Sequence, residues 1–161
     1  MKSVFDASCI INLLNGDSLG AVLSLSEYTF LIGPIVKSEC IINQNEITNF
    51  INKNMLTEIN ADEISGGVFL HLLQQHKLGE GETECLAYCL SSDTLMACDD
   101  KRARRIGKQE LGEQKVIGTL ALLKTCVQYR LLTDTEALRK VEQMKSRGAF
   151  LPIVDLKFFG V

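Results

Sequence analysis

The residues best suited to chemistry are concentrated in one stretch, residues 78–108. It begins with three glutamates ahead of an apolar run on helical spacing, and a short apolar run at 95–98 is then followed by two aspartates; these acids are Glu80, Glu82, Glu84, Asp99 and Asp100. Five cations come next, namely Lys101, Arg102, Arg104, Arg105 and Lys108. A helix and a strand in this order can bring carboxylates to one edge of a sheet, with cations beside them. The pattern predicts a site for a metal ion and a phosphate.

Asp6 is the first acid that the rest of the chain can add to this site. It follows a short β-favouring run at residues 2–5, and Ser8 then precedes apolar positions spaced as in a short helix, for which Ser8 is an acceptable N-cap. A strand that leads into a helix places Asp6 at the carboxyl end of the strand, the edge at which ligands bind in open α/β sheets. The alternative is that Asp6 only caps the turn.

Glu39 is the second acid. Residues 29–32 form a β-favouring run that Pro34 interrupts, and a helix is predicted from about Lys37. Glu39 would then lie in the first turn of that helix. There it could serve the site, or it could interact only with the helix dipole.

Glu82 is expected to contribute from the helix at 82–90. It lies one turn before Leu86 on the core-facing stripe, so its carboxylate could point along the helix towards the ligand edge. Its neighbours Glu80 and Glu84 are expected to point into solvent. The strand predicted at 95–98 then places Asp99 at its carboxyl end, and Asp100 should face away or cap the next helix.

The cations and one hydroxyl could hold an anionic substrate. A charge run such as residues 101–108 is usually the solvated face of a helix. The neighbouring acids support a second interpretation, in which these cations contact a phosphate backbone. Thr119 follows a strand predicted at 115–117, where it could be the N-cap of the helix at 120–129 or could reach a phosphate.

Composition limits the class of protein. The chain has 161 residues, 46% of them hydrophobic, and a net charge of −3, which suits one domain with a proper core and argues against a generally basic nucleic-acid binder. No apolar run is long enough to span a membrane, so we expect a cytoplasmic protein. The six cysteines lie mostly in apolar runs without a CxxC pair, which favours core packing.

Predicted strands and helices alternate along the chain at spacings typical of parallel crossovers. We therefore expect a single three-layer α/β domain over residues 1–161, with a central, mostly parallel sheet flanked by helices. A last amphipathic helix begins after Thr133, and an apolar tail follows it to residue 161. This C-terminal part, residues 133–161, should pack on the domain or on a partner.

Five segments, in this order, resemble the PIN domain family, which includes the VapC-type ribonuclease toxins. They are VFDASCIINLL, PIVKSE, GEGETECLAYCL, LMACDDKRARRIG and VIGTLALL. The last three are similar to a branch with a GE-type helix start, a double aspartate followed by arginines and a GTLGxL-like segment. The resemblance covers most of residues 2–132. The third acid is a glutamate where many members have aspartate, and Ala121 stands where this branch often has glycine.

The resemblance implies a metal-dependent endoribonuclease with a PIN-like fold. Its catalytic and metal-binding acids would be Asp6, Glu39, Glu82 and Asp99. Its substrate-binding residues would be Ser8, Thr119, Lys101, Arg102, Arg104 and Arg105. Crowded carboxylates repel one another, and a divalent cation such as Mg²⁺ or Mn²⁺ with oxygen ligands removes that repulsion. The substrate would be RNA, a toxin would have an antitoxin protein as partner, and a homodimer is left open.

Two other functions fit parts of the pattern. One is a PIN-like binding module whose site is catalytically idle. The other is a phosphohydrolase of the haloacid dehalogenase type, which also starts with a strand that ends in aspartate but needs a second aspartate two residues later, where this chain has Ser8. A Mn²⁺-induced rise in melting temperature would separate a metal site from an idle fold, and a phosphate-ester dye substrate would test the phosphohydrolase.

Overall fold

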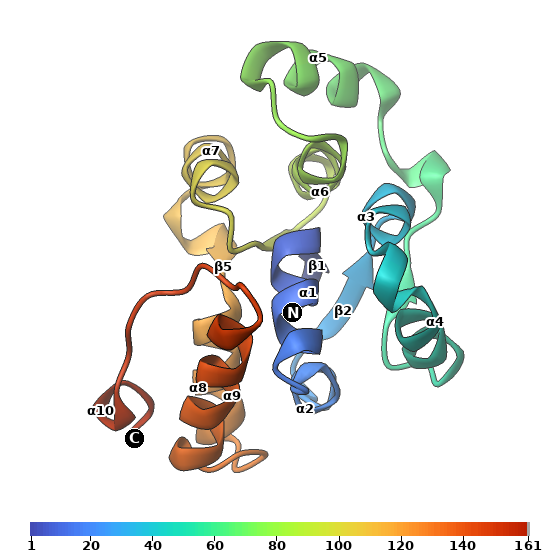
Figure 1. The fold of residues 1–161 in the computed structure, drawn as a ribbon. Coiled ribbons are helices and arrows are strands. Elements are labelled where there is room, and N and C mark those ends of the chain that lie inside the picture. Colours follow the sequence, from blue (N-terminus) through green and yellow to red (C-terminus); the bar gives the residue numbers. More distant parts are fainter. Residues whose placement is uncertain (161) are drawn as a thin grey trace.

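A single parallel sheet forms the centre of the molecule (Figure 1). The computed structural model describes residues 1–160. The strand order is β3-β2-β1-β4-β5, and every neighbouring pair is parallel. The strands are β1 (Lys2–Phe5), β2 (Thr29–Ile32), β3 (Thr57–Glu58), β4 (Thr94–Ala97) and β5 (Val116–Ile117).

Helices connect and cover the strands. The α-helices are α1 (Ala7–Asn15), α2 (Leu19–Leu23), α3 (Pro34–Glu39), α4 (Gln44–Asn52), α5 (Gly66–His76), α6 (Glu80–Ser91), α7 (Lys101–Leu111), α8 (Thr119–Gln128), α9 (Asp134–Ser146) and α10 (Leu156–Phe159). Three short 3-10 helices are η1 (Ile41–Asn43), η2 (Ala61–Glu63) and η3 (Glu113–Lys115). Within residues 1–160, no helix has both the length and the apolar character needed to cross a membrane.

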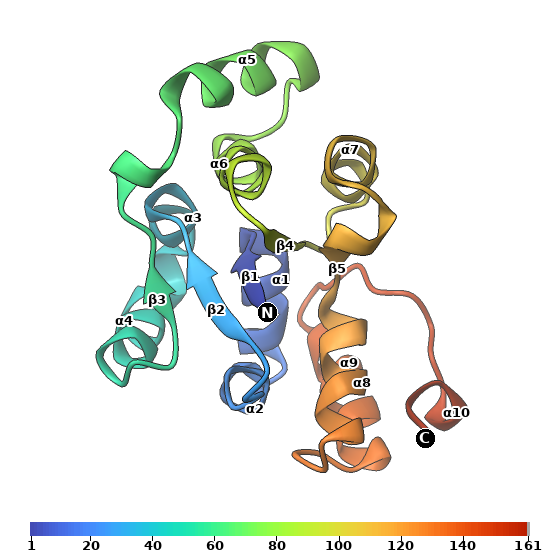
Figure 2. The same ribbon diagram turned by 180° about the vertical axis from the view of Figure 1, so that it is seen from behind.

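The helices form layers on the two sides of the sheet, as expected for an α/β fold. Helices α6 and α7 contact each other and the strands on one side, and α1, α2, α8 and α9 contact one another on the other side (Figures 1 and 2). Because helices cover both sides, the central strands read as short apolar runs without strict alternation. Phe5, Ile32 and Met96 are fully buried between the layers.

Most predicted elements are confirmed, with shifted ends. The strand expected at 95–98 lies at Thr94–Ala97. Helix α3 starts at Pro34, three residues earlier than predicted, because proline suits the first helical position, where its fixed φ is helical and no N–H is required. Glu39 is therefore the last residue of α3, and its predicted first-turn position is wrong. Helix α5 starts at Gly66 after the N-cap Ser65.

The strand register brings the predicted acids to one edge. Phe5 is the partner of Ile32 on one side and of Ala97 on the other, and Ala97 is the partner of Ile117. The amide of Asp6 continues this ladder by donating to the carbonyl of Ala97 at 2.9 Å. The residues that follow these strand ends consequently share the carboxyl edge of the sheet.

The C-terminal segment packs on the domain but leaves some apolar side chains exposed. After α9 the chain passes the carboxyl edge near β5 and ends in α10, which contacts α8 and α9 (Figure 2). Leu151 is partly buried against the core and Phe159 is fully buried, whereas Phe150 and Ile153 are 100% and 91% exposed. The packing of residues 133–161 on the domain or on a partner stays a prediction, and Val161 lies outside the described residues.

Candidate active site

Asp6 lies at the end of β1 and starts α1. Its carboxylate accepts a hydrogen bond from the amide of Ser8 at 3.2 Å, so Asp6 is the N-cap of α1 and the predicted cap, Ser8, lies inside the first turn. Asp6 is only 2% exposed. The thiol of Cys98 donates to Asp6 Oδ2 at 3.3 Å. Burial and the Asp6 carboxylate raise the pKa of the Cys98 thiol, which therefore stays protonated as a donor.

Ser8 joins the ends of the two central strands. Its hydroxyl donates to Asp6 Oδ2, and it accepts from the amides of Asp99 at 3.0 Å and Asp100 at 3.2 Å. A serine hydroxyl has one proton and two lone pairs, so these three bonds use its full capacity. The arrangement favours a positioning role for Ser8 over the substrate contact expected from the sequence.

Asp99 is held by polar groups from two helices. Asn12 Nδ2 of α1 donates to Asp99 Oδ2 at 2.8 Å, and the amide of Thr119 donates to Asp99 Oδ1 at 2.9 Å. The hydroxyl of Thr119 also donates to Asp99 Oδ2. Thr119 is the first residue of α8, and the predicted N-cap position belongs to Gly118. The neighbouring Asp100 caps α7, as the sequence predicted.

The two glutamates reach this edge from other elements. Glu82 lies in the first turn of α6 and accepts from the amide of Gly79 at 3.0 Å. Glu39, at the end of α3, accepts from the amide of Gly81 at 3.1 Å. Partial burial raises the pKa of both carboxyls, and the charge of Asp6 raises both further. The Asp6 carboxylate therefore acts electrostatically on both glutamates.

Glu84 does not point into solvent as expected. It is 1% exposed, and its carboxylate accepts from the amides of Ile35 at 3.0 Å and Val36 at 3.0 Å. These amides belong to the first turn of α3, whose unpaired N–H groups need acceptors. Glu84 thus fastens α3, the helix that carries Glu39, to α6.

Two glycines allow acids to approach the backbone closely. A Cβ on Gly81 would lie 2.3 Å from Glu39 Oε2. A Cβ on Gly118 would lie 2.8 Å from Asp99 Oδ1 and 2.7 Å from Arg104 Nη1. Real Cβ atoms do not approach other atoms so closely, so any side chain at either position would displace an acid of the site.

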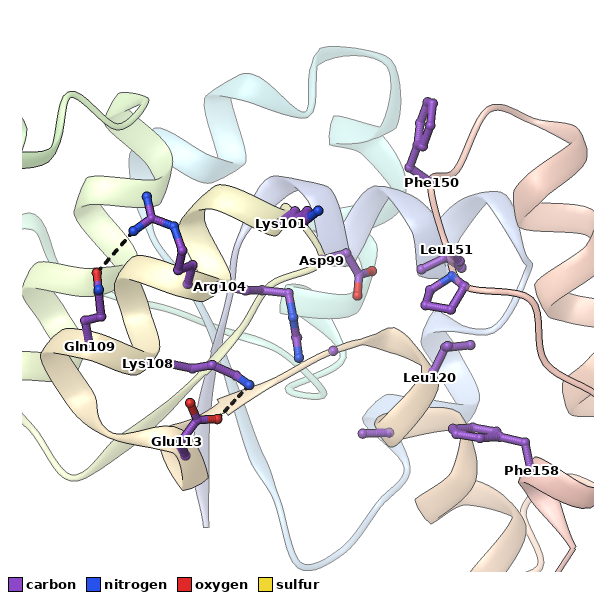
Figure 3. Close-up of a pocket in the computed structure, with 14 residues that line it drawn as sticks. Asp99, Lys101, Arg104, Lys108, Gln109, Glu113, Leu120, Phe150, Leu151 and Phe158 are labelled. Atoms are coloured by element: carbon purple, nitrogen blue, oxygen red, sulfur yellow. Dashed lines mark hydrogen bonds and ion pairs between the residues drawn. The ribbon is translucent and has the colours of Figure 1, made fainter.

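A groove of about 980 Å³ opens beside Asp99 (Figure 3). Lys101, Arg104 and Arg105 of α7 line it together with Lys108, whereas Arg102 is not among its lining residues. The Arg102 guanidinium instead donates to the carbonyl of His76 at 2.7 Å. Three of the four cations predicted to bind substrate are therefore placed in one groove with Asp99.

A model of the PIN domain family matches residues 2–154. The chain belongs to the PIN domain family. No curated protein and no solved structure gives a significant match to it. PIN domain membership supports an enzyme of the nuclease type. It also argues against the phosphohydrolase alternative, as does Ser8, whose hydroxyl takes the place of the second aspartate that such an enzyme needs.

The acids of this PIN domain fit a hard divalent cation by their chemistry, because all four offer carboxylate oxygens. Among residues 1–160, no three His, Cys, Asp or Glu side chains are grouped closely enough to hold one ion together. Mg²⁺ is usually bound by one or two carboxylates and completes its shell with water. The donor set therefore suits an ion with Asp6 or Asp99 as direct ligands and the other acids reached through water.

Three residues of this PIN domain site were not predicted from the sequence. Asn12 carried a signal, since it is the one polar residue within the apolar run CIINLL, and it is buried beside Asp99. Gly118 was not predicted as part of the site, and Cys98 was expected only to pack in the core. Their contacts with Asp99 and Asp6 depend on tertiary packing, for which the local sequence gives no pattern.

Proposed function

We propose that the protein is a metal-dependent ribonuclease that hydrolyses phosphodiester bonds of RNA at the carboxyl edge of its sheet. One observation carries this proposal: Asp99 lines the groove together with the cations of α7, and the Ser8 hydroxyl connects Asp99 to Asp6. A polyanionic chain could lie in the groove with one phosphate at the acids.

The acids would hold a Mg²⁺ or Mn²⁺ ion. Asp6 and Asp99 would be direct ligands, and Glu39 and Glu82 would act on the ion through bound water. When bound, the ion would supply an activated water as nucleophile and stabilise the charge that develops on the phosphate.

The other residues would keep the acids in place. Ser8 fixes the relative position of Asp6 and Asp99, because its hydroxyl bonds to both. Asn12 and Thr119 donate to the Asp99 carboxylate, which fixes its orientation.

The cations of α7 would bind the RNA backbone. Lys101 and Arg105 are exposed, so they can contact phosphates without breaking an ion pair of the protein. Such contacts position a nucleic acid without reading its sequence. Arg104 is more constrained, since it donates to the carbonyl of Cys98 at 2.7 Å.

The test is cleavage of a mixed structured RNA by the purified protein with Mn²⁺, Mg²⁺ or EDTA. We expect cleavage with either metal, none with EDTA, and none with Asp99→Asn. Asp93→Asn is the matched control, because Asp93 precedes the opposite end of the same strand and is exposed. No cleavage and no Mn²⁺-induced rise in melting temperature would favour the idle binding module.

The proposal includes the role of toxin in a toxin–antitoxin pair, supported by the VapC-like motifs of the sequence and by the exposed apolar side chains Phe150 and Ile153, which an antitoxin could cover. An RNA substrate would place the protein in the cytoplasm. Induced expression should arrest growth, and Asp99→Asn should relieve the arrest. Growth arrest that persists with Asp99→Asn would refute the toxin role.

A homodimer remains a prediction, to be tested by light scattering.

A further inference from the structure

The groove beside Asp99 has two walls of different chemistry. One wall is cationic and consists of Lys101, Arg104, Arg105 and Lys108. These residues are spaced by three, four and seven positions, so they lie on one face of α7. Three of the four already have partners: Lys108 pairs with Glu113 at 2.7 Å, Arg104 donates to a carbonyl, and Arg105 donates to Gln109 Oε1 at 3.5 Å. Lys101 and Arg105 form no ion pair within the described part of the chain.

The opposite wall is apolar and includes the C-terminal tail. Leu120 and Phe158 line it together with the tail residues Phe150, Leu151 and Pro152 (Figure 3). Leu151 and Phe158 are partly buried against the core, but Phe150 is 100% exposed. A fully exposed aromatic ring at the rim of a cationic groove has a face available for stacking.

A single strand of nucleic acid matches these two walls. Its phosphates carry charge along one side, and its unpaired bases present apolar faces on the other. The bases of a duplex are stacked on one another, so they cannot lie on an aromatic side chain unless they leave the helix. The groove, about 980 Å³, lies at the upper end of the range of roughly 300–1,000 Å³ that is typical of ligand pockets.

We propose that this groove is a subsite for an unpaired nucleotide next to the scissile phosphate. Phe150 stacks on the base, and Lys101 and Arg105 contact the backbone. The C-terminal tail thereby selects RNA that is single-stranded at the site of cleavage. The choice of RNA as ligand rests on the proposed function, but binding in the groove can be measured without cleavage.

The first measurement is the affinity of the protein for a short single-stranded RNA in EDTA, by fluorescence anisotropy. Stacking on one aromatic residue is worth enough that Phe150→Ala should weaken binding by about fivefold or more. Phe150→Trp should restore it. Ile153→Ala is the matched control, because Ile153 lies on the same tail, is 91% exposed and does not line the groove. It should leave the affinity unchanged.

A double-mutant cycle then identifies the base as the partner of Phe150. The RNA is made with one abasic nucleotide, at each position in turn. At one position the missing base should weaken binding to the wild type but not to Phe150→Ala, since the ring and the base act as one pair. Equal losses for both proteins at every position would overturn the stacking assignment.

The cationic wall gives an independent readout. Lys101→Ala should reduce the slope of log affinity against log salt by about 0.7 for each phosphate that the lysine neutralises in the wild type, whereas Phe150→Ala should leave the slope unchanged. A duplex of the same sequence should bind without dependence on Phe150.

The outcomes separate this inference from the proposed nuclease. If neither cleavage nor RNA binding depends on Phe150, the inference is overturned and the proposed nuclease stands. Binding that depends on Phe150 without any cleavage would support the inference and contradict the nuclease. If RNA binds to neither the cationic wall nor the apolar wall, the inference is overturned and the groove is left free for a protein partner.

Discussion

Replacing Ser8 with alanine would remove the hydroxyl that joins the end of β1 to the end of β4. The substitution takes a donor from Asp6 and an acceptor from the amides of Asp99 and Asp100. Alanine suits the first turn of α1, so the helix itself should persist. The change therefore tests the bridge between the two aspartates.

The expected loss of stability follows from these three bonds. A hydrogen bond to a charged group contributes about 1.5–3 kcal/mol, and a buried amide without a partner costs about 1–3 kcal/mol. Asp99 is half-buried and Asp100 is exposed, so water replaces part of the hydrogen bonding that the amides have in the wild type. We expect a total loss of about 2–4 kcal/mol, which for a domain of this size lowers the melting temperature by about 4–16 °C.

Thermal unfolding followed by circular dichroism measures this loss. Ser146→Ala is the control. The Ser146 hydroxyl donates to the carbonyl of Gln143 at 2.8 Å at an exposed position of α9, so its loss should change stability by less than about 0.5 kcal/mol. Cleavage by Ser8→Ala, measured below its melting temperature, should also fall. A Ser8→Ala protein that melts like the Ser146→Ala control and cleaves at the wild-type rate would refute the bridge.

Three further changes test other parts of the site. Gly118→Ala should reduce stability by about 1–3 kcal/mol in melting experiments and should also reduce cleavage, because the added Cβ would collide with Asp99 and Arg104. Its control is Gly67→Ala, which should be neutral or slightly stabilising because nothing lies within 4 Å of the added Cβ. Glu84→Ala should cost about 2–4 kcal/mol, since it leaves two amides of α3 without an acceptor, and equal losses for the exposed Glu80→Ala would contradict this role. The raised pKa of Glu82 means that its contribution to the stability of metal-free protein is present at low pH and is lost as the pH rises through the folded-state pKa. Glu82→Gln should remove this pH dependence from the melting temperature in EDTA, and an unchanged profile would show that the pKa is not raised.

The strand ends were the most predictable part of the fold. Short apolar runs at residues 2–5 and 95–98, each followed by an aspartate, predicted both strands and the placement of Asp6 and Asp99 at one edge, and the strands lie within one residue of those positions. This works because parallel strands are buried on both faces, so the apolar run itself marks the strand and the first acid marks its end. The helical spacing of residues 101, 104, 105 and 108 likewise shows in the sequence which cations share a face.

Contacts between distant segments were not predictable in the same way. Glu84 was expected in solvent because its partners, the amides at the start of α3, lie 49 residues away. The position of Glu39 was missed because Pro34 was interpreted as a break in a strand, although proline also starts helices. The apolar wall of the groove depends on where the tail crosses the domain, and the sequence showed only that the tail was apolar.

The measurement that tests the metal site most directly is a calorimetric titration of Mn²⁺ into metal-free protein, with Asp99→Asn and the Asp93→Asn control. We expect the wild type and the control to bind Mn²⁺. A mutation of a residue that only orients a metal ligand typically lowers metal affinity by about 10- to 100-fold. Asp99→Asn changes a direct carboxylate ligand, so it should weaken Mn²⁺ binding by at least about tenfold. Equal binding by all three proteins, or no binding by the wild type, would contradict the site.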